Sequence, residues 1–248
     1  ELANIYDELG ADFFAVSNID EGIEIRNSGC KLPIVILGYT PVADAKRLSD
    51  YDISQAVFSL EYAKSLSDEC VKQNCTCKIH IKVDTGMSRI GFMCQQFPRD
   101  DYSIKEILEV CNLPNLSLEG LFTHFCVSDE AEEGREFTQR QYQNLIYAKN
   151  AIQSNGINIK YVHCSNSGAI EDYPYTYCDM VRAGIILYGL SPSRKLCGKL
   201  DLIPAMTLKT TVAYVKNLKK GSDISYGRTF TAPKDMKIAT VPIGYADG

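Results

Sequence analysis

The chain has 248 residues, 45% of them hydrophobic and 23% charged, and its net charge is −5. This composition is typical of a soluble globular protein with room for one large domain or two smaller ones. Lys and Arg are interspersed with Asp and Glu, so no basic stripe indicates nucleic-acid binding. No apolar run reaches the roughly 18 residues of a membrane helix, and no signal-peptide pattern opens the chain, so we expect no membrane segment.

Ten cysteines are scattered along the chain, and their only close grouping is Cys70, Cys75 and Cys77. The resulting C-x4-C-x-C spacing is not a usual zinc arrangement. We therefore predict no metal site, and we expect the reduced, mostly buried thiols of a cytoplasmic protein.

Short apolar, β-branched runs alternate with amphipathic segments, beginning with a helix that has Leu2, Ile5 and Leu9 on one face and Gly10 at its end. The strands expected after it lie at residues 13–17, 34–38, 56–59, 78–85, 118–125, 160–164 and 180–186. The helices expected between them lie at residues 18–28, 43–50, 60–74, 103–111 and 135–155. Strands that alternate with helices predict a parallel sheet.

Seven strands preceded by a helix indicate a missing first strand, and eight strands are the number in a (β/α)8 TIM barrel. The predicted fold is therefore α/β, with a TIM barrel over residues 1–201 whose first strand is missing. An open doubly wound sheet is the alternative, and the absence of the Rossmann glycine fingerprint disfavours it.

The sequence changes character after about residue 202. The runs at 206–215, 223–226 and 237–243 are β-like and have no helical segment between them. Residues 202–248 are therefore predicted to begin an all-β domain. Since the chain starts at Glu1 and stops inside an uninterrupted GYADG, we expect both ends to be cut from a longer protein.

The segment at residues 78–92, KIHIKVDTGMSRIGF, is the strongest indication of a site. Successive strand side chains point to opposite sides, which gathers Lys78, His80, Lys82 and Asp84 on one face. The strand then ends at a glycine turn that presents Arg89. Because unpaired buried charge is costly, this pattern indicates a functional site and not core packing.

Barrel enzymes place their sites on the loops that follow the strands. Here those loops carry polar, cationic and hydroxyl-bearing residues, at 17–18, 59, 84–89, 124, 165–167 and 182–185. The last two loops suit a phosphate, because one opens a helix with Ser-Asn-Ser-Gly and the other offers the closely spaced N–H groups of Ala-Gly-Ile. No carboxylate pair or metal-ligand cluster competes for this end of the barrel.

Six segments together resemble the motifs of the alanine racemases and occur in that family's order across nearly the whole chain. They are KVDTGMSRIG at 82–91, THF at 123–125, HCSNS at 163–167, VRAGI at 181–185, SYG at 225–227 and GYADG at 244–248. The resemblance implies a pyridoxal 5′-phosphate (PLP) enzyme with an N-terminal barrel and a C-terminal β domain that works as a head-to-tail homodimer. It also implies interconversion of L- and D-alanine through a PLP aldimine by two bases, which supplies bacterial cell-wall synthesis.

The resemblance assigns roles to individual residues. Arg182 would face the pyridine nitrogen of the cofactor, and His124 would hydrogen-bond this arginine. Arg89 would contact the phenolic oxygen of the cofactor and the carboxylate of the substrate. The positions that resemble the phosphate-binding residues are Asn166, Ser167, Gly184 and Ile185.

Inversion at one carbon requires a proton acceptor on each face of it. One base in the family is the lysine released from the cofactor, and the other is a tyrosine of the partner's β domain, which Tyr226 resembles. Tyr245 matches a further tyrosine at the substrate entrance. Lys82 matches a position that is often carbamylated, where the added carboxylate would orient Arg89.

The sequence also departs from the family. The lysine that binds PLP lies in a K-x-x-x-Y-G-H-G segment, and no such segment occurs in this chain. We therefore expect these 248 residues alone to be inactive. A serine or broad-specificity racemase is the nearest alternative, and a non-catalytic PLP-binding barrel protein is a second, disfavoured by SYG at 225–227 and GYADG at 244–248.

Overall fold

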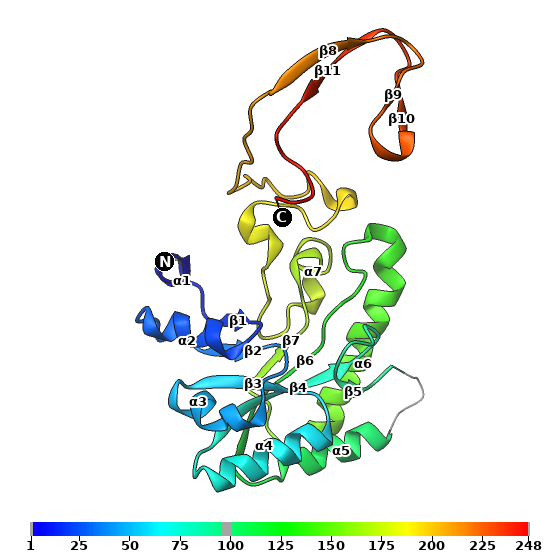
Figure 1. Cartoon of the computed structure of the whole chain (residues 1–248). Coiled ribbons are helices and arrows are strands. Elements are labelled where there is room, and N and C mark those ends of the chain that lie inside the picture. The colour runs from blue at the N-terminus through cyan, green and yellow to red at the C-terminus, as the bar shows by residue number, and fades with distance from the viewer. Residues whose placement is uncertain (1, 96–100, 248) are drawn as a thin grey trace. The chain divides into compact units, whose positions relative to one another are not determined.

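The computed structural model describes residues 2–95 and 101–247. The chain divides into two compact units, with the boundary along the chain between Ile203 and Pro204. The first unit contains one large sheet with helices, and the second contains two small two-stranded sheets (Figure 1).

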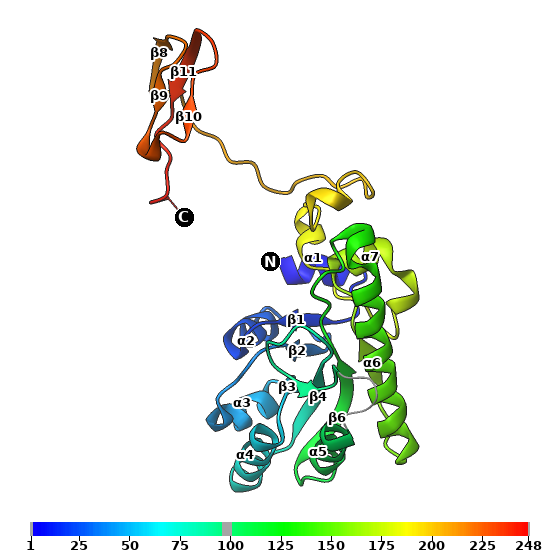
Figure 2. The ribbon, with the colours of Figure 1, turned by 90° about the vertical axis from the view of Figure 1, so that its right-hand side faces the viewer.

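The first unit is built on one parallel sheet whose strands follow the order of the chain. The order is β1-β2-β3-β4-β6-β7, and the short β5 pairs with β4. The bounds are β1 Phe14–Val16, β2 Ile34–Ile36, β3 Ile53–Val57, β4 Cys77–Asp84, β5 Phe92–Met93, β6 Leu116–Phe122 and β7 Tyr161–His163. A doubly wound sheet would reverse its strand order at a switch point. The curled sheet in Figure 1 and Figure 2 does not, which confirms the predicted barrel fold.

The α-helices of this unit are α1 Leu2–Glu8, α2 Ile19–Asn27, α3 Ala45–Asp50, α4 Leu60–Lys72, α5 Asp101–Cys111, α6 Arg135–Ser154 and α7 Ser167–Asp172. Helices α2 to α6 lie along the sheet, and the short α1 and α7 lie near one end of it (Figure 2). Asn18, Ser59 and Asn166 begin α2, α4 and α7, because each side-chain oxygen accepts a backbone N–H of the first helical turn. Across the part of the chain that the structure describes, no helix has both the length and the apolar composition needed to cross a membrane.

Short 3₁₀ helices complete the first unit. They are η1 Val42–Asp44, η2 Ala131–Gly134, η3 Pro174–Thr176, η4 Ile185–Tyr188 and η5 Arg194–Leu196.

Strand β4 turns its polar face to the inside of the curled sheet. Ile79, Ile81 and Val83 pack with helix residues in the hydrophobic core. His80 and Lys82 alternate with them and are equally buried. The predicted alternation of β4 is therefore present, and its charged face lies in the interior of the barrel.

Two expected strands differ from the structure. The strand predicted at 56–59 is β3, which starts earlier, at Ile53, because polar residues inside it have internal partners. Ser54 donates to Glu119 at 2.8 Å, and Gln55 donates to the Gly38 carbonyl at 2.7 Å. The strand predicted at 180–186 is reduced to a single bridge between Met180 and His163.

The chain after Met180 still runs beside β7, since the Arg182 N–H donates to the Ser165 carbonyl at 2.9 Å. Gly184 then takes φ −128° and ψ −98°, and η4 begins. This backbone lies outside both the strand and the helix regions. The pairing with β7 therefore ends at the loop of residues 182–185, where a phosphate-binding loop was predicted.

The second unit consists of β8 Tyr214–Leu218, β9 Asp223–Ile224, β10 Phe230–Thr231 and β11 Met236–Thr240, with η6 Tyr226–Arg228 between β9 and β10. Strands β8 and β11 pair antiparallel, as do β9 and β10. The β-like run predicted at 206–215 is a strand only from Tyr214. Met206 and Leu208 before it are more than three-quarters exposed, so nothing in the described chain buries that segment.

Candidate active site

Arg182 lies where β6 and β7 end. Its Nη2 group donates to the carbonyls of Thr123 (2.9 Å) and Cys164 (3.1 Å), and Nη1 lies 2.7 Å from Nδ1 of His163. The Nε–H group is buried and has no hydrogen-bond partner among the described residues. Two backbone carbonyls and an imidazole thus fix the guanidinium while one of its strong donors remains available.

A buried row of imidazoles continues from Arg182 into the barrel. His163 Nε2 lies 3.0 Å from His80 Nδ1, and both rings are fully buried. Because the guanidinium only donates, His163 accepts at Nδ1 and carries its proton on Nε2. His80 then accepts at Nδ1 and carries its own proton on Nε2, which has no partner among the described residues. Both imidazoles are therefore interior groups with hydrogen-bond partners.

The surroundings of Arg182 are strongly electropositive. Burial and the charges of Arg182, Lys82 and Arg89 lower the pKa of His124 to about 3, so its ring is neutral. Nδ1 of His124 lies 3.3 Å from Nη2 of Arg182, within reach of the hydrogen bond expected from the sequence. Burial, followed by Arg182 and Arg89, lowers the pKa of Lys82 to about 8. Such a cluster favours an anion or a neutralising group.

The aromatic ring of Phe122 lies close to both Lys82 and Arg182. The Nζ atom of Lys82 is 5.0 Å from the ring centroid and the guanidinium carbon of Arg182 is 5.7 Å from it. The ring also stacks on His163, with centroids 4.8 Å apart and planes within 2° of parallel. Phe122 therefore stabilises both cations through its π face and fixes the imidazole that supports Arg182.

Arg89 is held by its loop, which is organised by one carboxylate. Oδ1 of Asp84 accepts three successive backbone N–H groups, those of Gly86, Met87 and Ser88, each at 3.0 Å. Three such bonds to one charged oxygen make a rigid turn. Arg89 itself is exposed at its tip. Gly91 closes the loop, and a Cβ atom there would lie 2.7 Å from the Asp84 nitrogen.

A second polar group supports the strand that carries His124. The hydroxyls of Thr85 and Thr123 lie 2.7 Å apart, and Nε2 of Gln141 in α6 lies 3.2 Å from the His124 carbonyl. Gln141 also accepts the Cys126 N–H at 3.1 Å. The ends of β4 and β6 are thereby tied to one buried glutamine.

The last two loops meet as expected. The Gly184 N–H donates to the Ser167 hydroxyl at 3.0 Å. Asn166 is occupied within the fold: its Oδ1 atom accepts from Ser128 at 2.7 Å and from the Ala169 N–H at 3.1 Å. Ser167 and Gly184 are thus brought together. The side chain of Asn166 instead fixes their loop, through Ser128 and the first turn of α7.

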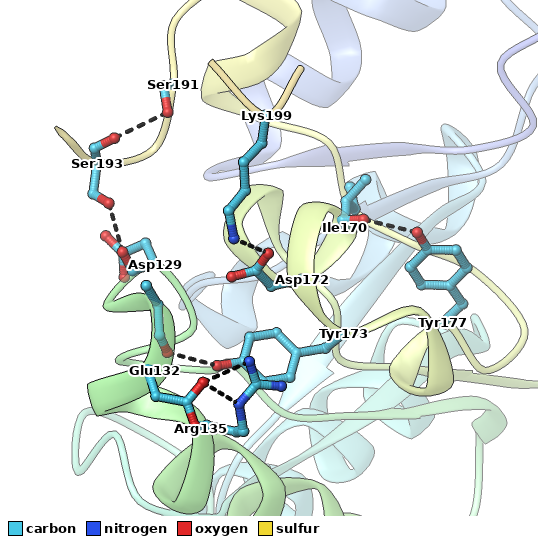
Figure 3. Close-up of polar contacts among 11 residues, drawn as sticks. Asp129, Glu132, Arg135, Ile170, Asp172, Tyr173, Tyr177, Ser191, Ser193 and Lys199 are labelled. Atoms are coloured by element: carbon cyan, nitrogen blue, oxygen red, sulfur yellow. Dashed lines mark hydrogen bonds and ion pairs between the residues drawn. The ribbon is translucent and has the colours of Figure 1, made fainter. Parts of the chain in front are cut away.

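The chain beyond η4 fastens this loop from outside (Figure 3). Lys199 forms an ion pair with Asp172 at the end of α7, and Ser193 donates to the Asp129 carbonyl. Tyr173 is buried and donates to the Ala131 carbonyl at 3.4 Å. The C-terminal end of the short helix α7 is therefore fixed.

A cavity of about 1440 Å³ opens along this side of the sheet. It runs from the edge of β1, at Phe14 and Val16, to Arg182 and Gly184. Ile185, the other predicted phosphate-loop residue, is 44% exposed beside it. Arg182 and Gly184 thus line one end of this cavity, whereas Lys82, His124 and Ser167 are not among its lining residues.

Tyr226 and Tyr245 belong to the second unit. Tyr226 is 92% exposed at the turn between β9 and β10, where Ser225 and Gly227 have positive φ angles of 60° and 69°. Asp223 stabilises this hairpin by accepting from Thr231 at 2.7 Å. Tyr245 is 96% exposed. The first unit thus carries the cations and the second presents two phenols.

Comparisons with known proteins agree with this geometry. A family model described as the alanine racemase N-terminal domain matches residues 1–192, and one described as the C-terminal domain matches residues 205–248. The chain belongs to the alanine racemase family. It is 47% identical to an alanine racemase of Clostridium perfringens over its whole length and spans 63% of that protein.

Solved structures support the same assignment. An alanine racemase of Clostridium difficile 630 is 39% identical, with a TM-score of 0.78 over 99% of this chain and 63% of the other. A histidine racemase of Leuconostoc mesenteroides is 30% identical, with a TM-score of 0.73 over all of this chain and 64% of the other. This alanine racemase family member contains no cluster of three or more metal-ligating side chains in residues 2–95 and 101–247.

Several supporting residues were not identified from the sequence. Asp84 was placed on the charged face without its role in the turn, although Asp-Thr-Gly after a strand is a signal for such a cap. Thr123 and Gln141 act through contacts between distant segments, and no local pattern indicates them. These residues position the predicted ones.

Proposed function

We propose that the full-length protein interconverts L- and D-alanine with PLP as its cofactor. The observation that carries this proposal is the Arg182 site, where a buried guanidinium keeps one donor free beside Lys82. The proposal concerns the longer protein, because this chain spans less than two thirds of its relatives.

The residues present fit PLP. The anionic phosphate and phenolate of this cofactor suit a cluster formed by Lys82, Arg89 and Arg182. The hydroxyl of Ser167 and the N–H group of Ile185 would hold the phosphate, with Asn166 fixing their loop. The Gly184 N–H, which donates to the Ser167 hydroxyl in this structure, would exchange that partner for the phosphate. When bound, PLP supplies an electron-withdrawing ring that acidifies the Cα proton of an attached amino acid.

Arg182 would donate its free Nε–H to the pyridine nitrogen. A guanidinium does not readily give up a proton, so Arg182 would keep that nitrogen unprotonated. His124 and His163, both neutral, leave the charge of Arg182 unopposed. Arg182 thereby favours rapid return of the proton to Cα over diversion to transamination.

Arg89 would bind the substrate carboxylate and the phenolic oxygen of the cofactor, and Lys82 would orient it. The lowered pKa of Lys82 increases the fraction of neutral amine, the form that reacts with CO₂. A carbamate would place a negative charge between the two guanidinium groups of Arg89 and Arg182. We therefore infer that Lys82 is carbamylated.

Tyr226 would act as the base on one face of Cα, and a lysine outside this chain as the base on the other. Its position at an exposed turn is suited to completing a site on another subunit of a head-to-tail homodimer. A phenol serves as a base only beside cations, which the Arg182 cluster supplies. Tyr245 would line the entrance for the substrate.

Alanine is the proposed substrate because the curated relative at 47% identity carries that name. Serine or broad specificity is the alternative, and the similar histidine racemase illustrates that this fold accepts other side chains. The match to a C-terminal domain model at 205–248 argues against a non-catalytic barrel protein. Production of D-alanine for the cell wall in the cytoplasm would follow from the proposed activity.

The test is turnover of L-alanine, L-serine and L-histidine by the full-length protein with and without PLP. We expect PLP-dependent racemisation that is fastest with alanine. Faster turnover of serine would make serine, and not alanine, the assigned substrate. No racemisation of any of the three amino acids would overturn the proposal. Intact-protein mass measured without acid should include one added CO₂, and a bare ammonium at Lys82 in an electron-density map would contradict carbamylation.

A further inference from the structure

Two cysteines meet behind the Arg182 site, one buried and one exposed. The sulfur atoms of Cys164 and Cys178 lie 3.9 Å apart. Cys164 is fully buried at the end of β7, and its carbonyl accepts from Arg182. Cys178 is exposed on the loop after η3. An accessible thiol thus lies beside an inaccessible one, a pairing that the proposed racemisation does not use.

The loop that carries Cys178 is fixed on both sides. The hydroxyl of Tyr177 donates to the Ile170 carbonyl of α7 at 2.7 Å (Figure 3). Asp179 donates through its N–H to the Val162 carbonyl at 3.0 Å, and its side chain accepts the Val162 N–H at 2.8 Å. The two sulfur atoms are therefore neighbours because the backbone holds them so.

The groups around Cys178 favour its thiolate. The contact with the Cys164 sulfur, in which either thiol can be the donor, is the main cause that lowers the pKa of Cys178, with smaller contributions from Lys149 and the Tyr142 hydroxyl. The Cys164 thiol also donates to the Thr176 carbonyl at 3.1 Å. Asp179 and burial act in the opposite direction. A partly exposed thiolate near a cation is the form of cysteine that reacts with oxidants.

We propose that Cys164 and Cys178 form a peroxide-sensitive dithiol that closes to a reversible disulfide. The Cys178 thiolate attacks one oxygen of a hydroperoxide, the O–O bond breaks, and a sulfenic acid and an alkoxide (hydroxide, from hydrogen peroxide) result; the alkoxide or hydroxide then takes a proton from solvent. The Cys164 sulfur then attacks that sulfenic sulfur; the S–S bond forms, the S–O bond breaks, and hydroxide leaves with the Cys164 proton as water. The two sulfurs together lose the two electrons that reduce the peroxide.

The chain contains two internal controls. Cys70 and Cys77 have sulfur atoms only 3.3 Å apart, but both are fully buried, so an oxidant cannot reach either. Cys197 is exposed, but its thiol donates to the Ser193 carbonyl instead of to a second thiol. Only the Cys164–Cys178 pair combines an accessible sulfur with a resolving sulfur, among the contacts that the structure describes.

The test is limited treatment of the reduced full-length protein with hydrogen peroxide, followed by alkylation and peptide mapping. We expect a Cys164–Cys178 crosslinked peptide that dithiothreitol removes. Cys178→Ser should abolish it, and Cys197→Ser should leave it unchanged. In Cys164→Ala, dimedone should trap a sulfenic acid on Cys178. Because Cys178 is exposed, Cys178→Ser keeps the test decisive even if Cys164→Ala fails to fold.

Two results would overturn the proposal. One is oxidation of Cys197 at a peroxide dose that yields no Cys164–Cys178 peptide. The other is equal formation of a Cys70–Cys77 disulfide, because then exposure would not select the reacting pair. Peptide mapping is independent of racemisation, so failure of the proposed function leaves this test intact.

A second readout rests on the proposed function. The disulfide would pull on Cys164, whose carbonyl holds Arg182 and whose neighbours form the phosphate loop. Racemisation should therefore fall as the crosslinked peptide accumulates and recover with dithiothreitol, and Cys178→Ser should be insensitive to the same dose.

Discussion

The Arg182 site and the Tyr226 hairpin place their functional groups in opposite ways. Arg182 is held by two carbonyls and a row of buried imidazoles. Tyr226 is 92% exposed and is presented by a turn with positive φ angles at Ser225 and Gly227. One region fixes a side chain by surrounding it, and the other fixes only the backbone beneath it. The orientation of the Tyr226 phenol is therefore left to be set by contact with a second surface.

The largest expected effect tests the exposed region. Tyr226→Phe in the full-length protein removes the proposed base, and such a loss lowers turnover by about 10²–10⁴-fold. Racemisation should fall equally in both directions, because the equilibrium constant fixes the ratio of the two kcat/KM values, but α-proton exchange with solvent should be lost for only one enantiomer, since each base serves one face. Solvent-deuterium incorporation into each enantiomer measures this asymmetry. Tyr214→Phe, at another exposed tyrosine of the same unit, is the control; equal rates in the two variants would contradict the role of Tyr226.

The next effect tests the buried region. Arg182→Ala removes the proposed charge at the pyridine nitrogen and leaves the Thr123 and Cys164 carbonyls without their donor. Loss of one positioned electrostatic donor costs about 10²–10³ in kcat. Arg182→Lys keeps a charge without the planar fork and should recover only part of the rate. An unchanged kcat in Arg182→Ala, with alanine as substrate, would show that Arg182 takes no part in the reaction.

A smaller effect separates packing from chemistry. A Cβ atom at Gly120 would lie 2.3 Å from Nδ1 of His80, so Gly120→Ala forces the imidazole row to shift. Overpacking of this kind destabilises by about 1–3 kcal/mol. Gly244 in the second unit has nothing within 4 Å of such an atom, and Gly244→Ala is the matched control. Equal unfolding midpoints in denaturant would show that the row tolerates displacement.

The smallest effect is a difference in acid sensitivity. Burial and Arg182 lower the pKa of His80 from 6.5 to about 3. The unfolded chain therefore binds protons below pH 6.5 that the folded barrel does not, so barrel stability falls as pH drops from 6.5 towards 3. In the hairpin, hydrogen bonds from Thr231 and Arg228 lower the pKa of Asp223 below 3.8, so its contribution is lost only at more acidic pH. Proton NMR titration of the imidazoles, with thermal unfolding across this range, measures both.

The fold was largely predictable because strands and helices repeat at different periods. Each predicted helix of the first unit is present within two residues of its expected bounds. Strand β3 was misplaced because Ser54 and Gln55 are polar and buried, and their partners lie on other elements. The run at 206–212 has strand-like composition but lies outside every strand of the described chain, and composition alone does not supply a pairing partner.

The candidate site was predictable to the extent that its residues are sequence motifs. Arg182, His124 and Lys82 were identified in this way, and the structure brings them together around Phe122. Contacts between distant segments were not predictable. The approach of Cys178 to Cys164 depends on how the loop after η3 folds back on β7, and the spacing of the two cysteines carries no sign of it.

The imidazole row also determines where protons cannot travel. Each ring nitrogen that faces Arg182 accepts from the ring or guanidinium before it, so the donors all point away from the arginine towards His80. To pass a proton toward Arg182, every tautomer would have to reverse and the guanidinium would have to release a proton that it retains at neutral pH. The row therefore does not conduct protons to Arg182. Proton exchange at the Arg182 end must use groups other than His163 and His80.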